Sequence, residues 1–205
     1  DGRAETAAEV PQRPSGLGFL PDGTPLIVSM QDRCVYRLEN GALQLHADLS
    51  GAVSAEINDM VVDDQGRAYI GDMGYDLFGG GPSAPGGIQL VEPDGSHRLV
   101  ADKLDFPNGM VITNGGDTLV VAESFGERLR AFDRAANGDL SNPRVYAKLP
   151  GLVPDGMCLD VDGNIWVAGA MGGAFVQVDP AGKVIARIEV GPDAAIACQL
   201  GGQDG

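Results

Sequence analysis

The sequence contains few of the residues on which many kinds of functional site depend. Its 205 residues include only two histidines and three cysteines, Cys34, Cys158 and Cys198. The cysteines are odd in number, widely spaced and without a C-x-x-C pair, so neither a disulfide framework nor a thiolate zinc site is expected. Buried, reduced thiols are typical of cytosolic proteins, and we expect a cytoplasmic location.

Basic residues are also scarce: 14 lysines and arginines stand against 29 aspartates and glutamates, for a formal net charge of −15. So acidic a chain repels phosphate backbones and anionic lipid, which disfavours nucleic acid and membrane surfaces as partners. No apolar run approaches the roughly 18 residues that a membrane helix needs, and the first residues do not resemble a secretory leader. The expected partner is a small molecule, with the oligomeric state left open.

Helical patterns are missing, but an internal repeat is present. No stretch shows a sustained 3.6-residue period between helix caps, so we expect essentially no helix. Four segments share a polar second position followed by an apolar strand: Pro14–Phe19, Ile57–Val62, Pro107–Ile112 and Pro154–Leu159. The polar positions are 43, 50 and 47 residues apart. This is the period of a β-propeller blade rather than the roughly 33 residues of helical repeats.

Each repeat continues in the same way. A turn such as Pro21–Gly23 or Asp162–Asn164 follows the first strand, and a β-branched or aromatic run such as Ala68–Ile70 follows the turn. A third strand and an alternating fourth strand, such as Lys183–Val190, complete the unit. Short strands between Gly and Asp-Gly turns predict four antiparallel strands per repeat. We therefore expect an all-β propeller that forms a single domain over residues 1–205.

The two ends have the pattern of incomplete repeats. Arg3–Val10 is expected to form a fourth strand without its preceding three, and Ala194–Leu200 the first strand of a further blade. The turn after that strand would lie in Gly201–Gly205, where the sequence stops. Propellers normally close by joining their termini, so about four complete blades with a partial one at each end predict a ring that is incomplete as given.

The polar second positions of the repeats should meet, because first strands of propeller blades line the central channel. They are Ser15, Asn58, Asn108 and Asp155. Amide and carboxylate oxygens suit a hard cation: calcium first, then magnesium or manganese, and zinc last because it prefers nitrogen and sulfur. Alternatively, these side chains cap backbone amides in turn-like strand starts. Asp59 is open to both interpretations, and Ser15 is expected to fill space in the channel.

Three segments, Asn58–Tyr69, Phe106–Met110 and Pro154–Ala168, resemble the senescence marker protein (regucalcin)/gluconolactonase/LRE-like family. The resemblance extends along essentially the whole chain. It implies a six-bladed propeller of four-stranded antiparallel blades, with one divalent cation in the central channel. It also implies hydrolysis of sugar lactones or related cyclic esters.

The resemblance assigns roles to individual residues. Asn108 is similar to the family's asparagine ligand of the cation, and Asp155 to its aspartate ligand. Asn58 is similar to the asparagine that contacts substrate or water, and we also expect it among the oxygen donors to the metal. No residue matches the family's glutamate ligand, which precedes the first of these repeats. Sugar-lactone members often carry an arginine where this sequence has Glu56, and a negative side chain there disfavours an acidic sugar.

For lactone hydrolysis, a cation would polarise the ester carbonyl while Asp155 takes a proton from water and Asn58 holds that water or the ring oxygen. No Gly-x-Ser-x-Gly elbow is present, which disfavours a serine hydrolase. Two alternatives remain: a non-catalytic propeller that binds a ligand or a protein, and an inactive shortened form of a lactonase. The Gly79–Gly87 run is expected to be a long loop, either a lid over the channel or disordered.

Overall fold

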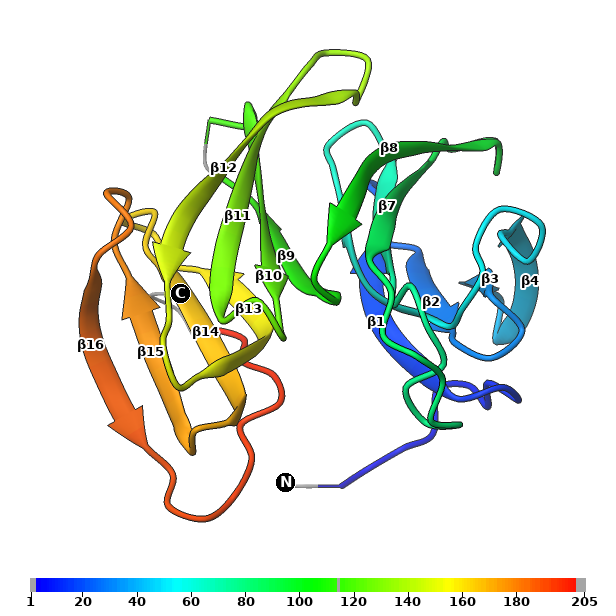
Figure 1. The fold of residues 1–205 in the computed structure, drawn as a ribbon. Coiled ribbons are helices and arrows are strands. Elements are labelled where there is room, and N and C mark those ends of the chain that lie inside the picture. The colour runs from blue at the N-terminus through cyan, green and yellow to red at the C-terminus, as the bar shows by residue number, and fades with distance from the viewer. Residues whose placement is uncertain (1–2, 114, 202–205) are drawn as a thin grey trace.

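A computed structural model describes residues 3–113 and 115–201. Within these residues sixteen strands form four antiparallel sheets of four strands each, and no helix occurs. The sheets follow one another around a common axis, with an open side between the first and last (Figure 1). The all-β, repeating architecture predicted from the sequence is confirmed, whereas the number of blades in a complete ring stays a prediction.

The four sheets, numbered here as blades I to IV, follow one another along the chain. Blade I contains β1 (Pro14–Phe19), β2 (Pro25–Ser29), β3 (Cys34–Glu39) and β4 (Ala42–Asp48). Blade II contains β5 (Ile57–Val62), β6 (Ala68–Asp72), β7 (Gly86–Val91) and β8 (His97–Leu104). Blade III contains β9 (Pro107–Ile112), β10 (Thr118–Glu123), β11 (Arg128–Arg134) and β12 (Leu140–Lys148). Blade IV contains β13 (Val153–Leu159), β14 (Ile165–Met171), β15 (Ala174–Val178) and β16 (Val184–Glu189).

Each blade runs from the axis outward in sequence order, so its first strand is the innermost. The inner strands contact one another in succession, β1 with β5, β5 with β9 and β9 with β13. The predicted turns between first and second strands carry glycines with positive φ, 86° at Gly23 and 81° at Gly163. These angles favour glycine because it has no side chain to clash. Asn114, in the corresponding turn of blade III, lies outside the described residues.

A glycine after the polar residue lets neighbouring inner strands approach closely. A Cβ atom at Gly16 would lie 2.8 Å from the backbone nitrogen of Met60, and one at Gly109 would lie 2.4 Å from the carbonyl oxygen of Asp155. At Gly156 it would lie 2.9 Å from the Cα of Ala197. Any larger residue would push the strands apart. The repeated polar–Gly pair therefore combines a side chain at the channel with a strand-packing position.

Apolar side chains fill the space between successive blades. Leu26 and Ile70 belong to the buried cluster between blades I and II, and Val120 and Ile165 to the one between blades III and IV. Burial of this kind is the main stabilising contribution, at roughly 1.5–3 kcal/mol for each large aliphatic side chain. Because each cluster draws on two blades, each blade depends on a neighbour to bury its apolar side chains.

A buried ionic group also joins blades II and III. The carboxylate of Asp63, in the turn after β5, accepts a hydrogen bond from Arg67 Nε at 2.7 Å. It accepts another from Arg134, at the end of β11, at 2.8 Å. Two arginines thus share one carboxylate across the blade boundary, which fixes the relative position of the two sheets.

Three local predictions need correction. Arg3–Val10 forms no strand, because the described residues supply no third strand with which a fourth could pair. Ala194–Leu200 runs along β13, where Gly156 N–H donates to Ile196 O at 2.9 Å, yet it forms no ladder. Gly86 and Gly87, placed in the loop by the sequence, begin β7 instead, so the loop spans residues 73–85. The turn predicted in Gly201–Gly205 falls mostly outside the described residues.

The cysteines agree with the expectation of free thiols. Cys34 and Cys158 are buried, Cys198 is half-buried, and none forms a disulfide. The sulfurs of Cys158, on β13, and Cys198, on the segment beside it, are 3.7 Å apart. Among the described residues there is no helix with the length and apolar character that crossing a membrane requires.

Candidate functional site

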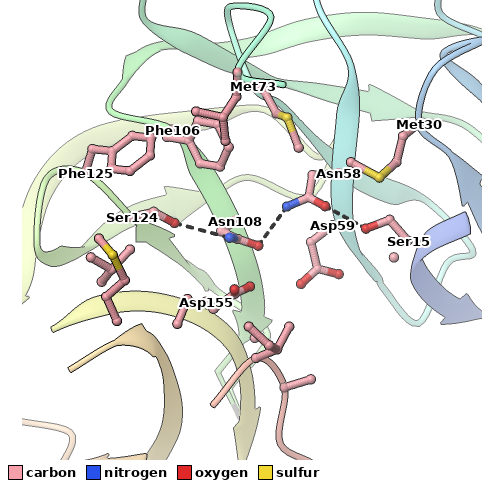
Figure 2. Close-up of a pocket in the computed structure, with 18 of the residues that line it drawn as sticks. Ser15, Met30, Asn58, Asp59, Met73, Phe106, Asn108, Ser124, Phe125 and Asp155 are labelled. Carbon is pink, nitrogen blue, oxygen red and sulfur yellow. Dashed lines mark hydrogen bonds between the residues drawn. The ribbon is translucent and has the colours of Figure 1, made fainter. Parts of the chain in front are cut away.

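The starts of the inner strands surround a cavity of about 650 Å³ near the axis (Figure 2). Its lining includes the four polar residues that the repeat singled out, Ser15, Asn58, Asn108 and Asp155. Each is the second residue of an inner strand or next to it, so blade geometry brings together positions almost 50 residues apart in sequence. Their convergence was predicted from the spacing, and the structure brings all four to one cavity.

A row of hydrogen bonds crosses the cavity and orients the two amides. Ser15 Oγ donates to Asn58 Oδ1 at 2.6 Å, and Asn58 Nδ2 donates to Asn108 Oδ1 at 2.9 Å. Asn108 Nδ2 donates to Ser124 Oγ at 3.2 Å, and that hydroxyl donates to the carbonyl of Pro154 at 2.7 Å. Figure 2 shows the side chains of this polar row pointing toward one another. The row links all four blades at their inner ends.

Two carboxylates face the same cavity. Burial, and to a smaller extent the negative charge of Asp59, raise the pKa of Asp155 to about 6, although hydrogen bonding from Gly156 and Asn108 acts in the opposite direction. Burial likewise raises the pKa of Asp59, whose Oδ1 accepts a hydrogen bond from Met60 N–H at 2.8 Å. Among the described residues no lysine, arginine or histidine lines the cavity. Two acidic groups without a basic partner create a negative potential that attracts a cation.

The donor chemistry of the site fits a hard metal ion. Asn58, Asn108, Asp59 and Asp155 offer oxygen atoms only, which calcium and magnesium prefer and zinc does not. Each amide oxygen in the row accepts one hydrogen bond and has a second lone pair available. Nowhere in the described residues do three or more His, Cys, Asp or Glu side chains lie close enough together to hold a metal ion, so neutral amides would make up a large part of the donor set.

Sequence reasoning missed the aromatic side of the cavity. Phe106 follows the outer strand β8, and Phe125 follows β10, so neither lies in a strand with a recognisable period. Their ring centroids are 4.9 Å apart, and Tyr75 packs against Phe106 at 6.0 Å. Phe106 has a φ of 63°, in the left-handed region that bulky residues rarely adopt. An aromatic residue immediately before the Pro107-Asn108-Gly109 start was the available signal.

Ser124, in the turn after β10, has two roles. Its carbonyl oxygen accepts a bond from Glu127 N–H at 3.4 Å in the turn, while its hydroxyl orients Asn108. The neighbouring Glu123 does not line the cavity. Its buried carboxylate instead accepts hydrogen bonds from Arg128 and Arg130 at 2.6 and 2.8 Å. Ser124 therefore belongs to the site, whereas Glu123 forms ion pairs that hold β10 to β11.

The loop over residues 73–85 reaches the cavity through its first half, whereas the Gly79–Gly87 run, where a lid was predicted, contributes no residue to the lining. Leu77 and Phe78 both contribute to the lining. The guanidinium of Arg13 lies 4.4 Å from the centre of the Phe78 ring and 3.4 Å from the carboxylate of Glu56. Glu56 is thus paired with Arg13, whose guanidinium contacts an aromatic ring and a carboxylate and is not part of the cavity lining.

Sequence comparison places these residues in a known context. A family model described as SMP-30/Gluconolactonase/LRE-like region matches residues 1–205. Regucalcin of Gallus gallus is 32% identical over 155 residues, which cover 72% of this chain and 51% of that protein. Regucalcin of Danio rerio is 29% identical over 162 residues, covering 77% and 54%. The chain spans about half the length of the curated relatives it matches.

Structure comparison gives a consistent result. A gluconolactonase from Xanthomonas campestris superposes with a TM-score of 0.78 at 23% identity, covering 95% of this chain and 68% of that one. A calcium-binding protein, regucalcin, from Agrobacterium tumefaciens has a TM-score of 0.74 at 24% identity, covering 91% and 63%. A luciferin-regenerating enzyme reaches 0.81 at 19% identity, covering 95% and 68%. At these identities the likeness concerns the fold.

Proposed function

Because this chain belongs to the SMP-30/gluconolactonase/LRE-like family, we propose that it is part of a divalent-metal-dependent hydrolase of lactones or related cyclic esters. The observation that carries the proposal is the meeting of Asn58, Asn108 and Asp155 at one cavity. Three oxygen-bearing side chains from three blades converge there, and one of them is a carboxylate with a raised pKa. Simple strand capping would not require them to share a cavity.

A divalent cation, calcium by preference, would be held by the oxygens of Asn108 and Asp155 with Asn58 beside them, and it would polarise the ester carbonyl. The remaining chemistry belongs to the chain itself. A carboxylate with a pKa of about 6 is mostly ionised at neutral pH, so Asp155 is able to accept a proton from an attacking water. Asn58 has a second amide hydrogen with which to orient that water or the ring oxygen.

Family membership also supports proposals for the complete ring, the location and the substrate. We propose that the whole protein closes as a six-bladed ring, since the described blades superpose on family structures that are longer than this chain. The free thiols favour a cytoplasmic location. The substrate is a small lactone or ester, and neither nucleic acid nor a membrane surface is a proposed partner.

A second candidate function is ligand binding without catalysis. It is favoured by the absence of a third carboxylate at the cavity among the described residues, because two carboxylates and amides bind calcium weakly. An inactive shortened form of a lactonase would have the same appearance. Both alternatives predict no turnover even when the cavity binds a ligand.

The deciding experiment measures hydrolysis of aldonolactones and simple γ- and δ-lactones with calcium, magnesium, manganese or zinc, against a chelator control. We expect turnover that needs a metal and falls at least a hundredfold in Asp155→Asn. The matched control is Asp162→Asn, which changes an exposed carboxylate of the same blade and should leave the rate unchanged. If no lactone is hydrolysed with any of the metals, the non-catalytic interpretation replaces this one.

A further inference from the structure

One side of the cavity is apolar, and nothing in the hydrolytic chemistry requires it to be so. Met30, Met73, Phe106 and Phe125, called here the apolar wall, stand along one side of the polar row (Figure 2). Leu77 and Phe78, from the 73–85 loop, extend the wall. The polar row and the two carboxylates lie beside this wall, so a ligand that spans both meets polar and apolar side chains together.

The apolar wall is firmly held. Phe106 keeps its left-handed backbone through two hydrogen bonds: its N–H donates to Leu104 O at 3.1 Å, and its carbonyl accepts from Ser124 N–H at 3.0 Å. Strained backbone of this kind persists where the surrounding structure fixes it and is concentrated at binding sites. The Phe106 ring is 6% exposed, and it supports that of Phe125, which is 49% exposed. The supported ring is therefore free to contact a ligand.

The charges at the cavity disfavour anionic ligands. No basic side chain lines the cavity among the residues that the structure describes, and Asp59 and Asp155 both face it. Arg13, which lies outside the lining, contacts Glu56 and Phe78. A polyhydroxylated sugar ring would meet the apolar wall with hydroxyl groups that find no partner there, which costs binding free energy.

We propose that the cavity takes a neutral lactone or cyclic ester that carries an alkyl or aryl substituent, with the ester group at the polar row and the substituent against the apolar wall. This inference rests on the proposed lactonase function and specifies its substrate class. Each additional buried methylene should raise kcat/KM about three- to fourfold, until the chain passes beyond the wall.

The test compares δ-decalactone, unsubstituted δ-valerolactone and glucono-δ-lactone as substrates of the calcium-loaded protein. We expect kcat/KM for δ-decalactone to exceed both others by at least tenfold. Phe125→Ser should lower kcat/KM for δ-decalactone at least tenfold more than kcat/KM for δ-valerolactone. Val161→Ser, a change at a 76% exposed residue outside the cavity lining, should have no effect. Faster hydrolysis of the sugar lactone, or an equal loss on all three substrates in Phe125→Ser, overturns the substrate class and leaves the hydrolase intact.

A binding measurement separates this inference from the proposed function. 3-Pentylcyclohexanone, in which a methylene replaces the ring oxygen of δ-decalactone, has the shape of this lactone but contains no ester to hydrolyse. Isothermal titration should show at least tenfold tighter binding than for cyclohexanone, with the advantage lost in Phe125→Ser. Equal affinities overturn the inference whether or not any lactone is turned over. Selective binding without turnover supports the ligand class while the hydrolase proposal fails.

A second inference rests on a different observation, the approach of two thiols at the boundary of blade IV. Cys158 Sγ and Cys198 Sγ are 3.7 Å apart, and the backbones beside them are joined by the bond between Gly156 and Ile196. We infer that this pair is a reversible oxidation site. The neighbouring Cys198 thiol lowers the pKa of Cys158, so the Cys158 thiolate would attack hydrogen peroxide to give a sulfenic acid and water. The Cys198 sulfur would then displace a second water to form the disulfide, so the two electrons and two protons end on the peroxide oxygens.

Peptide mapping after treatment with hydrogen peroxide tests the site. We expect a Cys158–Cys198 linked peptide, loss of two titratable thiols, restoration by dithiothreitol, and a rise in Tm of several degrees, because the bridge ties the final segment to β13. Cys34→Ser should leave the linkage unchanged, and Cys198→Ser should abolish it. Linkage through Cys34, or loss of a single thiol without a bridge, overturns the inference.

Discussion

The carboxylate of Asp59 raises the pKa of Asp155, although the two residues belong to β5 and β13 and the strand β9 lies between them. Asp59 and Asp155 come from blades II and IV, 96 positions apart in the sequence. Their interaction exists only because the inner strands converge on the axis. The channel therefore stores electrostatic repulsion that a bound cation would relieve.

The first prediction concerns stability without metal. The folded-state pKa of Asp155, about 6, lies above its ordinary value of 3.8. The folded state therefore binds the proton more tightly, and stability falls as pH rises from about 4 to about 6 and stays lower above that range. Asp155→Asn should raise the free energy of unfolding by about 2 kcal/mol at pH 8 in a chelator, and by less than about 0.5 kcal/mol at pH 4.

Urea denaturation at the two pH values measures this difference. Asp162→Asn serves as the control, because its exposed carboxylate should give the same change at both. Calcium should then stabilise the native protein but not Asp155→Asn. Greater stability of the native protein at pH 8 without metal would contradict the prediction.

The second prediction isolates the contribution of Asp59. Burial is the larger cause of the raised pKa of Asp155 and the charge of Asp59 the smaller. Asp59→Asn should therefore lower the pKa of Asp155 by a fraction of a unit and leave it above 3.8. Carbon-13 NMR titration of the Asp155 carboxyl in metal-free protein measures the change. A full return to 3.8 would show that the ranking of the two causes is wrong.

The third prediction concerns the polar row. Asn108 is 6% exposed and forms hydrogen bonds to both neighbours, so Asn108→Ala leaves buried polar groups without partners. The free energy of unfolding should fall by about 2–3 kcal/mol. Ser15→Ala, at the exposed end of the same row, should cost no more than about 0.5 kcal/mol. An equal loss of unfolding free energy in the two variants would mean that the buried hydrogen bonds of Asn108 stabilise the protein no more than the exposed one of Ser15.

The fourth prediction compares two arginine–aspartate pairs with similar geometry. Arg134 lies 2.8 Å from Asp63 with both side chains buried, whereas Arg144 lies 2.6 Å from Asp133 with both about half exposed. Arg134→Met should cost about 2–3 kcal/mol, because Asp63 keeps only Arg67 as a basic partner. Arg144→Met should cost less than about 1 kcal/mol. Thermal unfolding of the two variants provides the comparison, and reversed costs would contradict it.

The fifth prediction tests the glycine of the polar–Gly pair. Gly109→Ala places a Cβ 2.4 Å from the carbonyl oxygen of Asp155, so β9 and β13 must separate. We expect a loss of more than about 2 kcal/mol and weaker metal binding, because Asp155 moves with its strand. Gly51→Ala, with no atom within 4 Å of the added Cβ, should be neutral or slightly stabilising. A neutral Gly109→Ala would contradict the close approach.

Much of this architecture can be predicted from local pattern. The blade period, the Asp-Gly turns and the convergence of Asn58, Asn108 and Asp155 all follow from repetition, because equivalent positions of equivalent blades face the same axis. Asn and Asp before Gly remained ambiguous between ligand and strand start, because both functions use the same residue types. The structure shows the shared cavity, and the metal role of these residues stays a prediction.

Other features depend on neighbours that the sequence does not identify. Phe106 and Phe125 lie in connections without periodicity, and their contact joins residues on either side of β9 and β10. The strand predicted at Arg3–Val10 had a suitable pattern but no described strand to pair with. Pairing between strands is a tertiary property, so pattern alone overestimates strand content at the ends of a repeat.

In three of the four repeats, one dipeptide carries both the channel-facing side chain and the glycine that seats the neighbouring strand. If a blade is duplicated, the channel-facing residue and the glycine that allows close strand packing are therefore duplicated together. The first residue of the dipeptide differs between repeats, as Ser15, Asn108 and Asp155 show, while the second is glycine in all three and preserves the fit between blades. Such an arrangement lets a lineage acquire new channel chemistry one substitution at a time without redesigning the ring.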